Sequence, residues 1–329
     1  MALALIPVDE ETPALVIGAG PNARFAYQEF LSGLDSPHTE RAYRSAVERF
    51  LRHCEALSLG LTQISPGVVS DYIKGLEKQI PGRDGEATHF EPASKPTRKL
   101  HLAALRHFFD CAVRRHAIVL NPAASVRGPR HSVTEGSTPA IHAKDARALL
   151  DSIDVTKVIG LRDRAVIAAL IYTAARVGAV SKLRCEDFYT DGRQFLLRLA
   201  EKGGKQRTIP CRHDLEGFVS EYIAAVGSMR DHSPLFRTVV RRSGTLSERG
   251  MTSNDMLRML KRRMAHAGLP FRQLCCHSFR AATATNLLEQ GVELADVQFL
   301  LGHSDPRTTK LYDRRTLSVT RNIVERIAI

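Results

Sequence analysis

The sequence predicts a mainly α protein of two domains, the second of which is of α+β type with a small antiparallel sheet. The chain has 329 residues, a length that favours two domains over one. Apolar residues recur with a helical period in most segments. A strand pattern is confined to residues 195–199 and 208–210, two short segments joined by a cationic turn that contains Gly-Gly.

The first part of the chain is predicted to form an arm, residues 1–23, and a compact helical domain, residues 24–125. The arm has no clear periodicity, although residues 14–19 are compatible with a short strand. The predicted helices span residues 24–31, 40–57, 66–79 and 95–116, with a loop containing Gly and Pro at 80–92. Ser-Pro pairs are start signals for the second and third helices, and Asn121-Pro122 stops the fourth.

A linker and a second domain follow. Residues 126–139 are rich in Gly, Pro, Ser and Thr and lack an apolar period, which predicts an exposed linker before a domain at 140–329. The predicted helices of that domain span 143–152, 162–172, 213–226, 254–267, 277–291 and 294–301, then a helix after Asp305 that carries Tyr312, and a tail helix at 316–329. Residues 233–236 are predicted as a buried connection and 237–250 as a basic loop.

Composition favours nucleic acid as the partner. The net charge is +12, and a duplex presents many phosphates to such a surface at once. On charge alone, a merely basic soluble protein or a membrane-surface binder stays open. The six cysteines include no Cys-x-x-Cys pair, which predicts reduced, mostly buried thiols in a cytosolic protein without a structural metal. The acidic N-terminus lacks a signal-peptide region, and no apolar run is long enough to span a membrane.

Residues 275–315 hold the most informative pattern of the chain. His277 and Arg280 are three apart, so on a helix they share a face and form a cationic surface suited to a phosphate. His303 follows a glycine at a predicted helix end, and Tyr312 comes nine residues later. Taken singly, each of these residues would be structural more often than functional.

In this order, His-x-x-Arg, Leu-Gly-His-Ser and Thr-Thr-Lys-Leu-Tyr resemble the C-terminal signature of tyrosine recombinases, the phage integrase family. The resemblance covers roughly residues 25–315, and the two-domain layout is similar to that of Cre and the Xer resolvases. It implies that residues 24–125 form a SAM-like core-binding domain and that residues 140–329 form the catalytic domain with a C-terminal tail helix. Whether that tail docks in cis or on a neighbouring protomer stays open.

Arg176 follows the apolar helix at 162–172. An Arg at such a place is costly unless it meets an anion or a carboxylate, and a structural salt bridge is one interpretation. The position resembles the first catalytic Arg of the family, with two departures. Ala174-Ala175 replaces the usual Gly-containing pair, and Ala179 stands where the family often has an acidic residue.

The turn at 201–207 reads Glu-Lys-Gly-Gly-Lys-Gln-Arg, a tight cationic hairpin tip. A Lys at a loop tip is usually only solvated. The Lys-Gly-x-Lys pattern resembles the mobile hairpin on which the family carries its catalytic Lys. The resemblance assigns that role to Lys202, with Lys205 as the runner-up.

The resemblance therefore implies six catalytic residues: Arg176, Lys202, His277, Arg280, His303 and Tyr312. Two Arg side chains would clamp the scissile phosphate while Tyr312 attacks phosphorus and forms a 3′-phosphotyrosyl bond. His277 would accept the phenol proton, Lys202 would protonate the departing 5′ oxygen, and His303 would donate a hydrogen bond to the phosphate. No metal or other cofactor is expected.

The expected partner is double-stranded DNA with inverted-repeat sites, bound by a homotetramer that exchanges strands through a Holliday junction, with no membrane involved. The candidate DNA contacts are Arg41, Arg44, Lys95, Arg98, Lys99, Arg106, Arg114, Lys205, Arg241, Arg242, Lys261 and Arg262. The protein is expected in the cytoplasm and to be of bacterial, phage or plasmid origin. Two alternatives remain: a type IB topoisomerase, which shares this chemistry, and a non-catalytic DNA-binding protein on the same fold.

Overall fold

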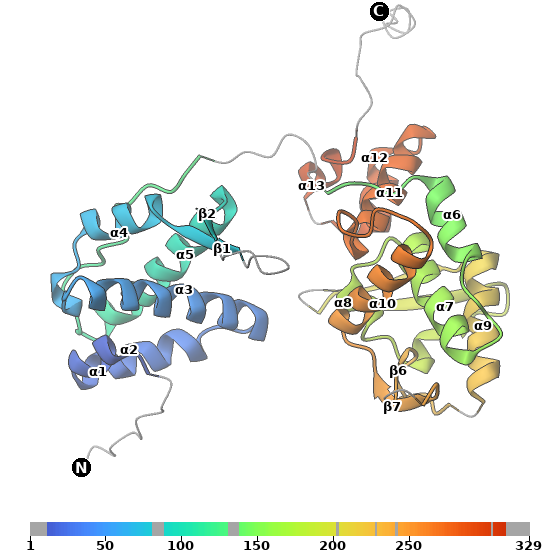
Figure 1. The fold of residues 1–329 in the computed structure, drawn as a ribbon, viewed down its shortest axis with the longest axis horizontal. Helices are drawn as coiled ribbons and strands as arrows, with labels where there is room; N and C mark the ends of the chain where they lie inside the picture. The colour runs from blue at the N-terminus through green and yellow to red at the C-terminus, as the bar shows by residue number, and fades with distance from the viewer. Residues whose placement is uncertain are drawn as a thin grey trace, which may run out of the picture. The chain divides into compact units, whose positions relative to one another are not determined.

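A computed structural model describes residues 12–80, 89–130, 138–201, 204–227, 229–240, 243–303 and 305–313. The chain forms two compact units, Met1–Ser132 and Val133–Ile329 (Figure 1). Among the helices within the described ranges, none has the length and apolar content needed to cross a membrane. The six cysteines form no disulfide, and Cys54, Cys111 and Cys276 are buried.

The first unit is helical. Its helices are α1 (Ala14–Gly18), α2 (Pro21–Ser32), α3 (Pro37–Ala56), α4 (Pro66–Lys74) and α5 (Lys95–Arg114), with a 3₁₀ turn at Leu61–Gln63. The four predicted helices correspond to α2–α5. Ser65 and Ser94 start two of them, because each side-chain oxygen accepts a hydrogen bond from a backbone N–H in the first turn. Phe50, Phe108 and Phe109 fill the core between α3 and α5.

Three expectations for this unit were wrong. Residues 14–18 form helix α1 and not a strand. Helix α4 ends at Lys74, where Gly75 caps it, so it is shorter than predicted. The segment that follows is the antiparallel hairpin of β1 (Glu77–Ile80) and β2 (His89–Pro92). Its side chains are almost all exposed, and an exposed hairpin carries no alternating apolar signal.

The second unit combines a three-stranded antiparallel sheet with helices, which confirms the predicted fold class. The strands β3 (Phe188–Thr190), β4 (Phe195–Ala200) and β5 (Gln206–Pro210) lie in chain order. The helices are α6 (Ala143–Asp151), α7 (Val158–Tyr172), α8 (Val177–Val180), α9 (His213–Val226), α10 (Ser253–His266), α11 (Cys276–Glu289), α12 (Leu294–Leu301) and α13 (Pro306–Lys310), with a 3₁₀ turn at Cys185–Asp187.

Here too the structure corrects some expectations. Strand β3 was not predicted, because its three residues are too few for a period. Residues 237–250, predicted as a loop, contain the hairpin of β6 (Arg237–Val239) and β7 (Leu246–Gly250). Tyr312 lies in the turn after α13 and not within that helix. The predicted tail helix at 316–329 lies outside the described residues.

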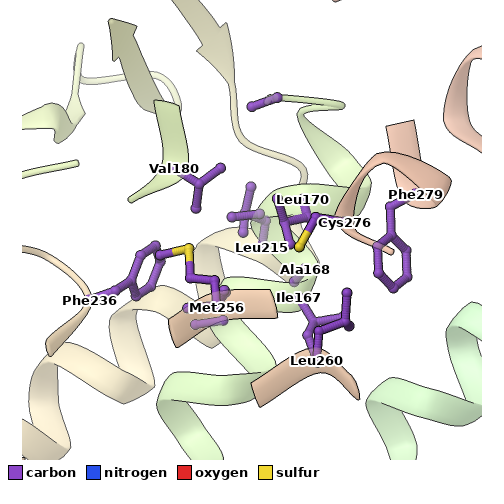
Figure 2. Packing of buried hydrophobic residues seen from close by; sticks show 14 of the residues in the cluster. Ile167, Ala168, Leu170, Val180, Leu215, Phe236, Met256, Leu260, Cys276 and Phe279 are labelled. Atoms are coloured by element: carbon purple, nitrogen blue, oxygen red, sulfur yellow. The ribbon is translucent and has the colours of Figure 1, made fainter. Parts of the chain in front are cut away.

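Helix α7 is the central element of the second unit. It has no polar face, because α8, α9, α10 and α11 all pack around it. Figure 2 shows Ile167 and Leu170 of α7 among Leu215, Leu260 and Phe279 of the surrounding helices. At its start, Asp163 is fully buried between two arginines. A helix held on all sides in this way places its C-terminal residues rigidly, and those residues lead directly to Arg176.

Candidate active site

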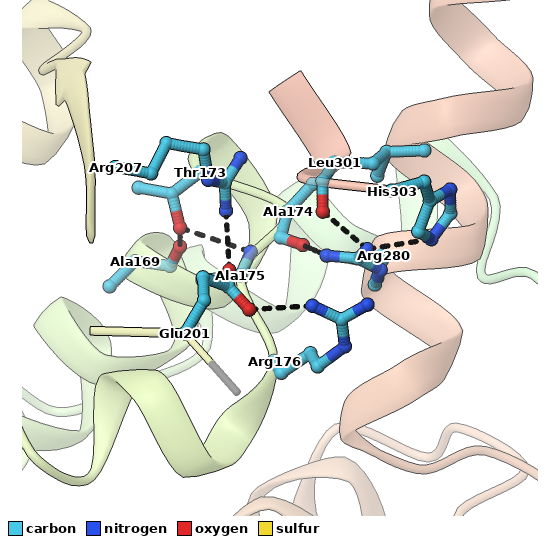
Figure 3. Close-up of polar contacts among 10 residues, drawn as sticks. All are labelled: Ala169, Thr173, Ala174, Ala175, Arg176, Glu201, Arg207, Arg280, Leu301 and His303. Atoms are coloured by element: carbon cyan, nitrogen blue, oxygen red, sulfur yellow. Dashed lines mark hydrogen bonds and ion pairs between the residues drawn. The ribbon is translucent and has the colours of Figure 1, made fainter. Parts of the chain in front are cut away.

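The chain leaves α7 through a strained turn. Thr173 donates a hydrogen bond to the carbonyl of Ala169 (2.6 Å) and accepts one from the backbone N–H of Ala175 (3.2 Å). Ala174 between them has φ +49°, in the left-handed region that favours glycine. The turn makes Arg176 the N-cap residue of α8, and its side chain extends toward Glu201 and Arg280 (Figure 3).

Arg176 meets a carboxylate. Its Nη1 lies 2.5 Å from Oε2 of Glu201, and Oε1 of the same carboxylate lies 2.9 Å from Nη2 of Arg207 (Figure 3). The side chains of Glu201 and Arg207 are 6% and 8% exposed, whereas that of Arg176 is 42% exposed. Glu201 therefore bridges one buried and one accessible guanidinium group.

Arg280 lies on α11 and is 1% exposed. Its Nη1 donates to the carbonyl of Ala174 (2.6 Å), and its Nη2 donates to the carbonyl of Leu301 (2.5 Å) and to Nε2 of His303 (2.8 Å). Burial and the neighbouring charge of Arg176 lower the pKa of Arg280 to about 10, which still leaves it a cation at neutral pH. Its Nε is buried and has no hydrogen-bond partner in the described part of the chain.

The hydrogen bonds of His303 define its tautomer. Arg280 can only donate, so Nε2 of His303 accepts and Nδ1 carries the proton. Nδ1 then donates to Oγ1 of Thr309, 2.8 Å away and fully buried. Burial, together with the charges of Arg280 and Arg176, lowers the pKa of His303 to about 4. In this arrangement His303 orients Arg280, and the expected donation to a phosphate is not available from its Nε2.

Tyr312 is the nucleophile candidate. Its phenolic oxygen lies 3.0 Å from Nε2 of His277, on the first turn of α11. Its ring is nearly parallel to that of His303, at 9° with centroids 6.1 Å apart, and its backbone carbonyl accepts a hydrogen bond from Thr285 (3.3 Å). Burial of the His277 imidazole lowers its pKa, and the positive charges of Arg280 and Arg176 act in the same direction. His277 is thus a neutral base at neutral pH.

Five of the six predicted catalytic residues belong to one cluster: Arg176, His277, Arg280, His303 and Tyr312. The sixth, Lys202, lies outside the described residues. Sequence reasoning missed Glu201 and Arg207. The only signals for them were the position of Glu201 directly before Lys202 and the absence of an acidic residue at Ala179.

The predicted DNA contacts divide into groups. Arg41, Lys95, Lys99, Lys205 and Arg262 are exposed. Arg44 pairs with Glu40 and Arg114 pairs with Glu29, while Arg98 is half-buried. Arg106 donates to the backbone carbonyls of Ala123 and Val126. Lys261 donates to those of Phe271 and Arg272. These bonds within each unit give both side chains a structural role. Arg241 and Arg242 lie outside the described residues.

Both units of the chain match known protein families. The model of the phage integrase family matches residues 139–317, and the model of the N-terminal SAM-like domain of phage integrases matches residues 26–116. Tyrosine recombinase XerC of Myxococcus xanthus is 28% identical over 287 residues, which cover 85% of this chain and 88% of the relative. Tyrosine recombinase XerD of Corynebacterium glutamicum is 30% identical over 296 residues, which cover 88% and 91%.

Solved structures show the same fold. A post-cleavage complex of the XerH site-specific recombinase with a palindromic difH substrate matches with a TM-score of 0.63 at 19% identity, covering 83% of this chain and 75% of that one. A lambda integrase dimer bound to a COC′ core site matches with a TM-score of 0.64 at 17% identity, covering 91% and 79%.

Proposed function

This chain belongs to the phage integrase family of tyrosine recombinases, and from that premise we propose that it cleaves and rejoins DNA at specific sites through a phosphotyrosine bond to Tyr312. One observation carries the assignment of the nucleophile. The Tyr312 phenol is hydrogen-bonded to His277 and lies in the same cluster as Arg176, Arg280 and His303. A tyrosine that served only the core would not need a basic and cationic surrounding.

The reaction follows from these groups. A free phenol has a pKa of about 10, so attack at neutral pH needs a base. His277 takes the proton from Tyr312 as the phenolic oxygen forms a bond to phosphorus. The bond from phosphorus to the 5′ oxygen of the next nucleotide breaks, and Lys202 supplies the proton that this oxygen takes up. A 5′ hydroxyl of the partner strand then attacks the phosphotyrosine and releases Tyr312.

The two arginines provide the phosphate clamp. The Nε of Arg280 is a buried donor without a partner in the described part of the chain, which a phosphate oxygen can satisfy. Arg176 uses Nη1 for Glu201 and is accessible, so its remaining donors can reach a second oxygen. Charge-assisted bonds from two such groups stabilise the additional negative charge of the transition state.

The proposed substrate is a duplex with inverted-repeat sites. A lambda integrase tetramer bound to a Holliday junction shares the fold of this chain, with a TM-score of 0.60 at 18% identity. For this chain we propose the same assembly, a tetramer that pairs two sites and exchanges strands through a four-way junction. The exposed Arg41, Lys95, Lys99 and Arg262 and the net charge of +12 support binding to the DNA backbone. Its DNA substrate would lie in the cytoplasm of a bacterial host, whether chromosome, phage or plasmid encodes the protein.

The test begins with the DNA that becomes covalently trapped on the protein in its host, because sequencing it identifies the site. A duplex of that site, nicked beside the scissile phosphate, should then accumulate a covalent adduct. A mobility shift without an adduct would support a non-catalytic binder, and relaxation of plasmids that lack the site would support a topoisomerase.

A further inference from the structure

We infer that Glu201 is a positioning residue for the cleavage reaction, because it holds the guanidinium group of Arg176 beside Arg280. The inference rests on the proposed recombinase function. The structure places this carboxylate at the base of the β4–β5 hairpin, directly before Lys202, whereas Ala179 leaves α8 without an acidic side chain next to Arg176.

The hairpin itself holds Glu201 in place. Strand β4 ends at Ala200, and the backbone N–H of Glu201 donates to the carbonyl of Lys205 (2.7 Å), one step beyond the Ala200–Gln206 pair of the ladder. The carboxylate is 6% exposed and uses both oxygens, Oε2 for Arg176 and Oε1 for Arg207. A carboxylate bound at both oxygens has one orientation, and it confers that orientation on Arg176.

Arg207 is the anchor of this arrangement. It lies on β5 opposite Leu199, and its side chain is 8% exposed. Its guanidinium group lies against Gly302, where a Cβ would come within 3.4 Å of Nε. Its Nε and Nη1 have no partner in the described part of the chain, so Glu201 provides the ion pair that compensates its buried charge. Arg207 therefore joins the hairpin to the end of α12, directly before His303.

The charges explain why Arg176 needs this partner. Burial lowers the pKa of both Arg207 and Arg280, and the positive charge of Arg176 acts in the same direction on each, so the three guanidinium groups are close enough to repel each other. Without the carboxylate, the orientation of Arg176 in which its side chain points into solvent would be lower in free energy, because it relieves this repulsion. With it, Arg176 keeps one nitrogen on Glu201 and presents the others to the site.

Substitution of Glu201 by glutamine is the central experiment, because it keeps the shape and removes the charge. E201Q should form the covalent adduct about 10- to 100-fold more slowly, the factor expected for one charged hydrogen bond. Binding of the duplex in a mobility-shift assay should stay within about twofold of wild type, since Arg176 is one phosphate contact among many. E201D, which keeps the charge on a shorter side chain, should lie between wild type and E201Q.

A modified substrate separates positioning from general damage to the fold. A methylphosphonate at the scissile position replaces one charged non-bridging oxygen by a methyl group and so reduces the need for Arg176. The ratio of the cleavage rate on this substrate to that on the normal phosphate should therefore be higher for E201Q than for wild type. Because both rates come from the same protein sample, this ratio does not depend on the fraction that is folded.

The control variant is E221Q, which removes the charge from a glutamate that pairs with Arg164 on the outside of α9. It should match wild type in rate and in substrate ratio. Equal behaviour of E201Q, E221Q and wild type would overturn the inference, as would an unchanged substrate ratio for E201Q. Faster cleavage by E201Q would also overturn the inference, because it would show that Glu201 competes with the phosphate for Arg176 and slows the reaction. Absence of any adduct with wild type would instead refute the proposed function.

Discussion

The phenolic oxygen of Tyr312 lies 3.0 Å from Nε2 of His277, although the two residues are 35 positions apart in the chain. Helix α11 carries the histidine, and the turn after α13 carries the tyrosine. The tyrosine ring packs with Ala281 and Leu301 in a small apolar cluster, which fixes its direction. The proposed nucleophile and its proposed base are thus in contact within one chain.

Replacement of Tyr312 by phenylalanine should abolish the covalent adduct and leave DNA binding intact. The substitution removes only the attacking oxygen, while the ring keeps its packing against His303. Denaturing gels of a nicked suicide substrate measure the adduct, and a mobility-shift assay measures binding. An adduct that persists in Y312F would refute Tyr312 as the nucleophile.

The pH dependence of cleavage should report His277. Its pKa lies below the ordinary 6.5, so the neutral base persists to lower pH than it would for a free histidine. The cleavage rate should rise with pH only below pH 6.5, and above pH 6.5 the titration of His277 should no longer affect it. H277A should lose that acid limb as well as most of the rate, as single-turnover assays from pH 5 to 8 would show. An acid limb centred above 6.5 would contradict the assignment.

Lys202 and Lys205 can be separated by the leaving group. K202A should slow cleavage of a normal 5′-oxygen substrate far more than that of a 5′-thio substrate, because a thiolate leaves without a proton. K205A serves as the comparison, since Lys205 is exposed at the other end of the same turn. Equal effects of K202A on both substrates would indicate that Lys205 is the proton donor, or that Lys202 only positions the substrate.

Thr309 should matter through His303. T309V keeps the shape but removes the acceptor for Nδ1–H, which leaves a buried donor unpaired. We expect a loss of about 1–3 kcal/mol in the free energy of unfolding and slower adduct formation, because His303 then no longer orients Arg280. Urea denaturation and cleavage rates test this, with T308V on the exposed neighbour as control. Wild-type stability and rate in T309V would exclude the role.

Asp163 should be a major determinant of stability. Its carboxylate is fully buried, and its two oxygens bind Arg162 and Arg263. D163N leaves two buried or partly buried cations without their counter-charge, which should cost about 3–5 kcal/mol. Thermal denaturation should show the loss, whereas the same change at the exposed Asp151 should have little effect. A loss below about 1 kcal/mol would show that water or another group replaces the carboxylate.

Much of this molecule could be derived from local patterns. The apolar period and the Ser and Pro start signals predicted α2 to α5 and α9 to α12, because helices form from contacts between residues three or four apart. The order of His-x-x-Arg, Leu-Gly-His-Ser and the final Tyr also indicated the family, because each motif consists of residues that are close together in the sequence and can be read without the fold. The hairpin β1–β2 escaped prediction because its side chains are almost all exposed, so no alternating apolar pattern marks its strands.

The tertiary structure alone decided the finer properties of the site. Glu201 and Arg176 are 25 residues apart, and nothing in either segment indicates that they form an ion pair. The proton on Nδ1 of His303 follows from Arg280 and Thr309, which lie on different helices. Ion pairs and tautomers depend on distances through space, whereas a sequence pattern records only distances along the chain. The sequence by itself therefore determined the candidate reacting groups and their order, and folding determined which of them touch.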